Sequence, residues 1–147
     1  MKSGIAIVLL LAGVLTSAQK DIAQTTQADH SRLTGVWRGQ MNDLPALTLV
    51  VTDEGGGLSG AVLFYFLTRK TENDPWTSTP GLPEPVLHLR VEGDTISFDV
   101  SHRRAHPPRT LNDPPVHFHL RLTAPNQSEL VNESEHSPAF ILTRSEY

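Results

Sequence analysis

Apolar and polar residues alternate along most of the chain after residue 32, and no stretch keeps the spacing of an amphipathic helix. Alternation places successive side chains on opposite faces of the backbone, so it predicts half-buried β-strands. Eight such strands are predicted: Leu33–Gln40, Ala46–Thr52, Leu58–Arg69, Val86–Val91, Thr95–Ser101, Val116–Leu122, Ser128–Glu133 and Ala139–Arg144.

The connections between these strands are of two kinds. Residues 53–57, 92–94 and 124–127 have the composition of tight turns, with Gly or Asn where a positive φ is needed. Residues 41–45, 70–85, 102–115 and 134–138 form longer connections. Successive connections of an antiparallel meander alternate between its two ends, so the tight turns share one end and the long loops share the other. We therefore expect an all-β fold, an eight-stranded antiparallel up-and-down barrel that closes on itself; the alternative is a β-sandwich.

The first eighteen residues have the pattern of a secretory signal peptide. Lys2 supplies a positive charge, residues 5–15 form an apolar run, and small residues precede an expected cleavage near Ala18. The run is too short to span a bilayer as a helix, so we expect no stable membrane anchor. The predicted organisation is a signal peptide (1–18), a tail or lead-in with room for a short helical turn (19–32) and a barrel domain (33–147). The protein is then exported, either periplasmic or secreted.

Composition narrows the partners of the mature chain. Removing Lys2 leaves 11 basic residues against 16 acidic ones, a net charge of −5, which argues against nucleic acid as a partner. Cysteine is absent, so the apolar core alone must stabilise the fold, and 129 residues are enough for one such core. We expect a monomer.

The segment LTGVWRG, residues 33–39, carries Gly35-x-Trp37 at the start of the first predicted strand. It resembles the Gly-x-Trp signature that opens the barrel of the lipocalin and wider calycin superfamily. It is also similar to small exported bacterial domains that begin with G-x-W-x-G and end in L-T-R, as residues 142–144 do here. The resemblance implies that Trp37 plugs the closed end of the barrel, that Arg144 packs over it, and that a small apolar molecule binds inside.

The aromatic residues bear on whether such a cavity exists. Eight-stranded barrels are either filled by side chains or hold one small ligand. Five phenylalanines are candidates for the interior: Phe64, Phe66, Phe98, Phe118 and Phe140. A filled barrel and a ligand pocket both stay open on this composition.

His117 and His119 lie two residues apart on one face of a predicted strand, a spacing at which two imidazoles can share a zinc ion. HFHL followed by SEH at residues 134–136 is similar to α-type carbonic anhydrases, but the third histidine of that family is missing from residues 139–143. Asp99 is a conceivable third ligand, whereas His88 is predicted to lie two strands away. Because the intervening apolar residues claim the core, we expect both histidines on the outside, in a solvated stripe, and predict no metal site.

The turn between the strands at 86–91 and 95–101 falls at Glu92–Gly93 or at Gly93–Asp94, and the second position sets His88 opposite Asp99, a favourable cross-strand pair.

The long loops are better candidates for binding. Trp76 lies in one of them, and the other carries a basic cluster of His102, Arg103, Arg104, His106 and Arg109. An aromatic ring and several arginines near one opening suit a carboxylate-bearing ligand or a protein partner. No catalytic triad, phosphate loop or nucleophile elbow is present in the sequence.

We therefore expect an exported, non-enzymatic protein that binds a small apolar or amphipathic molecule at the open end of the barrel, without a cofactor. The alternative is a protein-interaction or inhibitor domain whose filled barrel presents the Trp76 loop and the basic loop. A third possibility is a weak metal-binding surface at His117 and His119.

Overall fold

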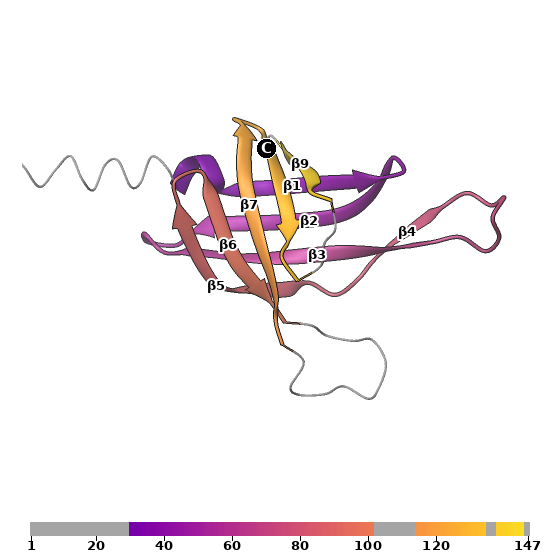
Figure 1. Ribbon diagram of the computed structural model, residues 1–147, viewed down its shortest axis with the longest axis horizontal. Coiled ribbons are helices and arrows are strands. Elements are labelled where there is room, and N and C mark those ends of the chain that lie inside the picture. Colours follow the sequence, from indigo (N-terminus) through magenta and orange to yellow (C-terminus); the bar gives the residue numbers. More distant parts are fainter. Residues whose placement is uncertain (1–29, 102–113, 135–137, 146–147) are drawn as a thin grey trace, which may run out of the picture.

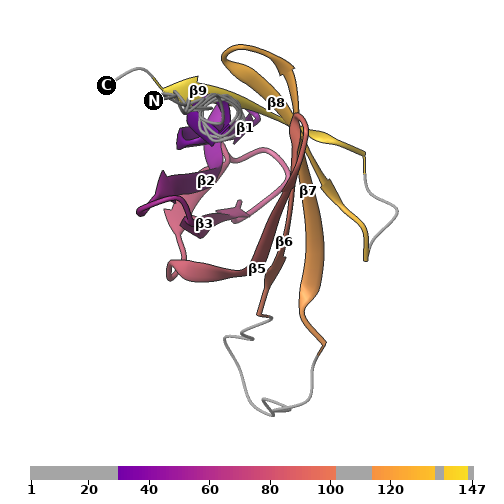
Figure 2. The ribbon, with the colours of Figure 1, turned by 90° about the vertical axis from the view of Figure 1, so that its left-hand side faces the viewer.

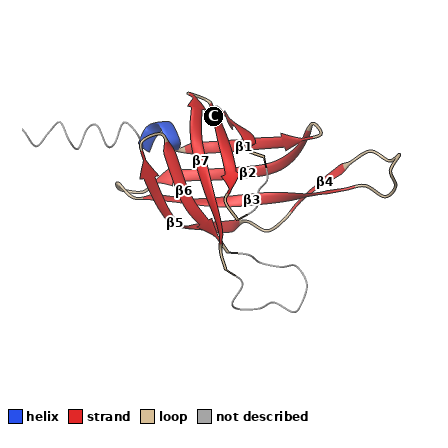
Figure 3. Ribbon diagram, viewed as in Figure 1, coloured by secondary structure: helices blue, strands red, loops and turns tan. Residues whose placement is uncertain are grey.

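The computed structural model describes residues 30–101, 114–134 and 138–145. Residues 1–29, with the predicted signal peptide and most of the predicted tail, lie outside this part. A one-turn helix over residues 30–33 precedes the strands (Figure 3). The strands are β1 (Gly35–Met41), β2 (Leu44–Asp53), β3 (Leu58–Thr68), β4 (Thr77–Pro80), β5 (Glu84–Glu92), β6 (Thr95–Val100), β7 (Val116–Ala124), β8 (Gln127–Asn132) and β9 (Phe140–Ser145).

Eight of these strands form a closed antiparallel ring. Each pairs with its neighbour in the order β1, β2, β3, β5, β6, β7, β8, β9, and β9 pairs with β1 to complete the circle. In Figures 1 and 2, β1–β3 cross the barrel at a steep angle to β5–β8. The predicted up-and-down barrel is therefore confirmed, and the sandwich alternative is wrong.

The ninth strand, β4, is an addition that the sequence pattern did not predict. It lies in the connection expected over residues 70–85 and pairs with the last four residues of β3. The two strands form a hairpin that projects beyond the barrel (Figure 1). The side chain of Ser78 donates a 2.5 Å hydrogen bond to the Pro45 carbonyl of β2, which ties the base of the hairpin to the barrel.

The turns confirm the predicted division into two ends, with one correction. Short turns join β2–β3, β5–β6 and β7–β8 at one end, here named the closed end. The connection at 41–45 was expected to be long, but it is a two-residue turn in which Asn42 and Asp43 have φ of 53° and 61°. Two positive φ values suit the right-handed twist of the flanking strands, and Asn and Asp tolerate them well. This turn lies at the opposite end with the longer loops, here named the open end.

The short helix covers the closed end. Leu33, predicted as the first strand residue, instead ends this helix and is fully buried. Its carbonyl accepts a 3.0 Å hydrogen bond from the Trp37 indole, which is also fully buried. The Arg144 guanidinium lies 5.8 Å from the centroid of the Trp37 ring and donates a hydrogen bond to the Ser31 carbonyl. The last strand thus locks the helix over the tryptophan, which is the contact between Trp37 and Arg144 that the resemblance implies.

Alternate residues of the ring fill its interior. The buried apolar residues are Leu33, Trp37, Leu47, Leu49, Val51, Val62, Ile96, Phe98, Val100, Phe118, Leu120, Leu122, Leu130 and Leu142. Ring contacts join three strands near the open end: the Phe98 and Phe118 rings are stacked at 5.6 Å, and the Phe64 ring lies 6.1 Å from that of Phe118. Within the described residues, no helix is long and apolar enough to cross a membrane.

Candidate functional site

The inner face of the barrel wall continues past the open end and leaves apolar side chains in solvent. Across β1, β2 and β3, Gly39, Leu47 and Phe64 form a row that pairs in register and is buried or half-buried. Two residues further along the same strands, Met41 is 49% exposed and Phe66 is 59% exposed. Strand alternation puts each on the same face as its buried predecessor. The inner surface therefore does not stop at the rim.

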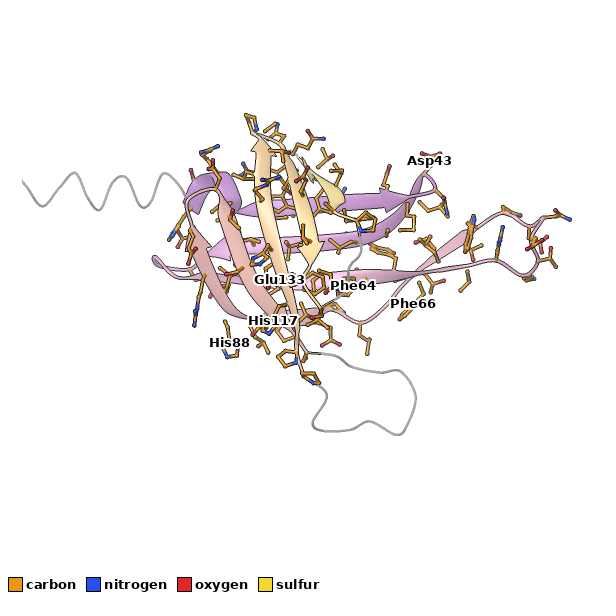
Figure 4. All side chains as sticks on the ribbon, viewed as in Figure 1. Asp43, Phe64, Phe66, His88, His117 and Glu133 are labelled. Atoms are coloured by element: carbon orange, nitrogen blue, oxygen red, sulfur yellow. The ribbon has the colours of Figure 1, made fainter. Side chains whose placement is uncertain are left out.

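Leu82 is a third exposed apolar residue at this end, in the connection between β4 and β5. It is 75% exposed, and its neighbour Gly81 packs on the Phe66 ring, because a Cβ at Gly81 would lie 3.1 Å from that ring. The Gly81 amide also donates a 2.9 Å hydrogen bond to the Phe64 carbonyl. We name Met41, Phe66 and Leu82 the apolar lip; Figure 4 shows Phe64 beneath the barrel strands and Phe66 further out along β3.

One of the five phenylalanines is therefore not where it was predicted. Phe98 and Phe118 are buried and Phe64 and Phe140 are half-buried against the core, as expected, but Phe66 is exposed. The reason is the length of β3, which carries Phe66 beyond the ring and into the hairpin with β4. A residue with the alternation of a core position thus becomes part of the lip.

A phenylalanine ring also lies across the backbone of β1 at the open end. A Cβ added to Gly39 would meet Cε1 of Phe140 at 2.1 Å and a methyl group of Leu142 at 2.6 Å. Only a residue without a side chain leaves the space that this ring occupies. Phe140, Phe64, Phe118 and Phe98 together form an aromatic layer below the lip.

A carboxylate lies on the inner face at the same end. Glu84 is the first residue of β5 and pairs in register with the fully buried Val62 of β3. Cross-strand partners share a face of the sheet, as do Glu84 and Val86, which packs against the core. The Glu84 side chain is 8% exposed, and among the residues that the structure describes it is the only buried one that can ionise.

Trp76, a predicted binding residue, lies just before β4. The Arg69 guanidinium sits 4.7 Å from its ring centroid, so the ring is stacked on a side chain of its own hairpin. Trp76 is partly exposed and stands on the projecting arm rather than on the barrel wall. The other predicted binding residues, His102, Arg103, Arg104, His106 and Arg109, lie outside the described residues.

The histidines of β7 face outward, as predicted. His117 and Asp99 form a short hydrogen bond, and the second oxygen of Asp99 is 2.8 Å from Nδ1 of His88. His119 is paired with Glu133 at 2.5 Å. Figure 4 shows His88 and His117 side by side. Since His117 and His119 each pair with a different carboxylate, they do not converge on a common point, and the described residues contain no group of three metal-ligating side chains able to hold an ion.

His88 reaches Asp99 through a bulge, which corrects the predicted register of this strand pair. Leu87, and not His88, is the register partner of Asp99, and the register shifts between Leu87 and Arg90. His88 has φ of 51°, the conformation of a bulged residue, and this turns its side chain outward beside Leu87. Leu87 is consequently exposed rather than in the core as predicted. The predicted contact between His88 and Asp99 does form, but through the bulge and not as a register pair.

The environment of Asp99 favours its ionised form. Burial raises the pKa of this carboxyl, but the hydrogen bonds with His88 and His117, together with their charges, outweigh it and hold the pKa below its ordinary value. Both imidazoles are more than half exposed. The group is a solvated polar cluster on the outer wall, and its side chains point away from the barrel interior.

Comparisons with known proteins found no match for this chain among family models, curated proteins or solved structures.

The candidate site consists of the apolar lip, the aromatic layer and Glu84. Sequence reasoning missed Glu84, which lies between two prolines and looks like a loop residue. The available signal was its spacing of two from Val86, which continues the inner register of that strand.

Proposed function

We propose that this chain is a non-enzymatic binding protein that holds a small apolar or amphipathic molecule at the open end of its barrel. The observation that carries the proposal is the apolar lip, where Met41 and Phe66 continue the inner face of the wall into solvent and Leu82 is exposed one residue after Gly81, which packs on the Phe66 ring. Exposed apolar side chains on one contiguous surface are typical of ligand-binding and interaction sites. Small closed barrels commonly serve as binding proteins.

The aromatic layer argues for binding at the rim rather than deep inside the barrel. Phe98, Phe118 and Phe64 are in ring contact across three strands, and Trp37 fills the closed end. A ligand that rests on this layer buries the exposed side chains of the lip. We also propose that the protein is exported, which the signal-peptide pattern of residues 1–18 supports. The resemblance of Gly35-x-Trp37 to the lipocalin signature is consistent with ligand binding.

The test is titration with Nile red, a neutral apolar dye that fluoresces strongly in apolar surroundings. Phe66→Ala removes the largest ring of the lip, and we expect about tenfold weaker binding, because burial of much of one aromatic ring is worth about 1.4 kcal/mol. Phe66 is already 59% exposed, so the substitution should leave the thermal stability nearly unchanged.

Ile141→Ala is the matched control. Ile141 is 47% exposed and alternates with the buried Leu142, so it lies on the outer wall of β9. The control should bind the dye like the wild type. Equal affinities for wild type and Phe66→Ala, or equal losses in both variants, would contradict binding at the lip.

A second candidate function is a protein-interaction domain, and the projecting β3–β4 hairpin favours it. Its tip carries Trp76 stacked on Arg69, a residue pair that is common in protein interfaces. An interaction domain predicts that Trp76→Ala abolishes co-purification of a partner while Nile red binding persists. The ligand-binding proposal predicts the larger effect at Phe66.

A further inference from the structure

We infer that the molecule bound at the open end carries a positively charged head group, an organic ammonium on an apolar body, and that Glu84 receives the charge. This inference rests on the proposed function and specifies the ligand class. It depends on the position of one carboxylate relative to the lip and to the aromatic layer.

Glu84 lies inside the mouth and not on its outer surface. Its partner Val62 is fully buried, and Val86, two residues further along β5, packs against the core. Phe64 follows Val62 by two residues on the same face of β3, so its ring lies between the level of Glu84 and that of Phe66. The order from the interior outward is therefore carboxylate, aromatic ring and exposed lip.

The Glu84 carboxylate is largely shielded from solvent. Glu84 is 8% exposed, and the buried residues described around the barrel are otherwise apolar apart from Ser128. A carboxylate in such surroundings interacts more strongly with a cation than one in bulk water does, because solvent screening is weaker. A head group of the same sign as Glu84 would be repelled for the same reason.

The Glu84 carboxylate already takes part in an interaction within the chain. A carboxylate has two oxygens and about four acceptor positions, so a ligand head group can share it with an existing contact. The aromatic rings on the way to Glu84 add to this preference. An ammonium group is attracted to the face of a phenylalanine ring, and Phe64 and Phe66 follow Val62, the register partner of Glu84, on the same face of β3.

The test compares three amphiphiles that share one decyl tail: decyltrimethylammonium, the neutral decyl maltoside and decyl sulfate. Each is titrated below its micelle concentration into the protein, and binding is followed by isothermal calorimetry. We expect the cation to bind about tenfold more tightly than the neutral compound and the sulfate to bind most weakly. In Glu84→Gln this preference should fall to within about twofold, with the affinity for the maltoside unchanged.

Glu92→Gln is the matched control. Glu92 ends the same strand at the closed end of the barrel and is exposed, so the substitution removes the same charge from the chain away from the mouth. This variant should keep the full preference for the cation. A loss of preference in Glu92→Gln equal to that in Glu84→Gln would assign the effect to net charge and overturn the inference.

The remaining outcomes separate the inference from the function on which it rests. If none of the three amphiphiles binds, the proposed function fails and the inference fails with it. If all bind equally, or the sulfate binds best, the apolar site stands and the cationic head group is refuted. Should Glu84→Gln not fold, nuclear Overhauser effects in the wild type decide the matter: we expect contacts between the trimethylammonium methyls and the side chains of Glu84 and Phe64, and contacts elsewhere would refute the assignment.

Discussion

Gly39 offers the sharpest test of how the open end is built. In the structure an alanine Cβ at this position would lie 2.1 Å from Cε1 of Phe140 and 2.6 Å from a methyl group of Leu142. Carbon atoms in contact prefer about 3.5–4.0 Å, so the ring has to move by about 1.5 Å or leave its site. Gly39→Ala should therefore displace Phe140 from the aromatic layer.

The expected magnitude follows from two opposing effects. Overpacking a well-filled site costs about 1–3 kcal/mol, while replacing glycine by alanine within a strand recovers about 0.5–1 kcal/mol of backbone entropy. The net loss in the free energy of unfolding should be about 1–2 kcal/mol, or about 4–8 °C in Tm for a domain of this size. Urea unfolding and differential scanning calorimetry measure both quantities.

A double-mutant cycle identifies the cause. Phe140→Ala removes the ring and leaves space into which the Leu142 methyl group can move. Adding Gly39→Ala to that background should therefore cost less than in the wild type, and the coupling energy should be about 1 kcal/mol or more. Gly57→Ala is the control, because the nearest atom to its Cβ is the Glu54 carbonyl oxygen at 3.9 Å. Additive effects within about 0.5 kcal/mol in the cycle would refute the placement of Phe140 over Gly39.

Two further predictions concern the closed end and the outer wall. Trp37→Phe should lower the free energy of unfolding by about 2–3 kcal/mol, because it removes the hydrogen bond to the buried Leu33 carbonyl and part of a fully buried ring. Thermal unfolding measures the effect. A Tm within about 2 °C of the wild type, the shift expected for about 0.5 kcal/mol, would contradict this prediction. Asp99→Asn should destabilise the protein by on the order of 1 kcal/mol near neutral pH, since His88 and His117 are largely solvated. The pKa of Asp99 is lowered in the fold, so its stabilisation is present above the unfolded pKa and is lost as pH falls through the folded pKa. The difference between variant and wild type in urea unfolding should shrink between about pH 5 and pH 2, and a constant difference would show that the ionised form is not what matters.

Alternation predicted the eight strands of the ring to within a few residues, because one face of each strand is committed to the core. It failed where a residue's surroundings are decided by its partner strand. Thr77–Pro80 is short and polar, and it becomes a strand only because β3 is long enough to pair with it. Leu87 has the alternation of a core residue, but the bulge at His88 turns it outward, and no local pattern marks a histidine at positive φ.

The sequence pattern predicted a candidate site at the open end, where the apolar lip also lies, but from other residues, five of which lie outside the described part of the chain. Trp76 was expected to receive a ligand, and its ring is stacked on Arg69. Phe66 was assigned to the interior and is the most exposed of the five phenylalanines. Glu84 was overlooked, since a glutamate between prolines is usually solvated, and its burial depends on pairing with Val62 from a distant part of the chain.

The seam between β1 and β9 has a consequence for when the molecule can fold. Three residue pairs close the ring, Val36–Ser145, Trp37–Arg144 and Arg38–Thr143, and they join segments more than a hundred residues apart. Contacts between such distant segments form late, because the loop that they close is long. During synthesis one edge of the first strand therefore stays unpaired until nearly the whole chain has emerged. The helix that covers Trp37 depends on the same seam through Arg144 and Ser31. Its docking should mark the last step of folding, and the newly made chain has an open strand edge until then.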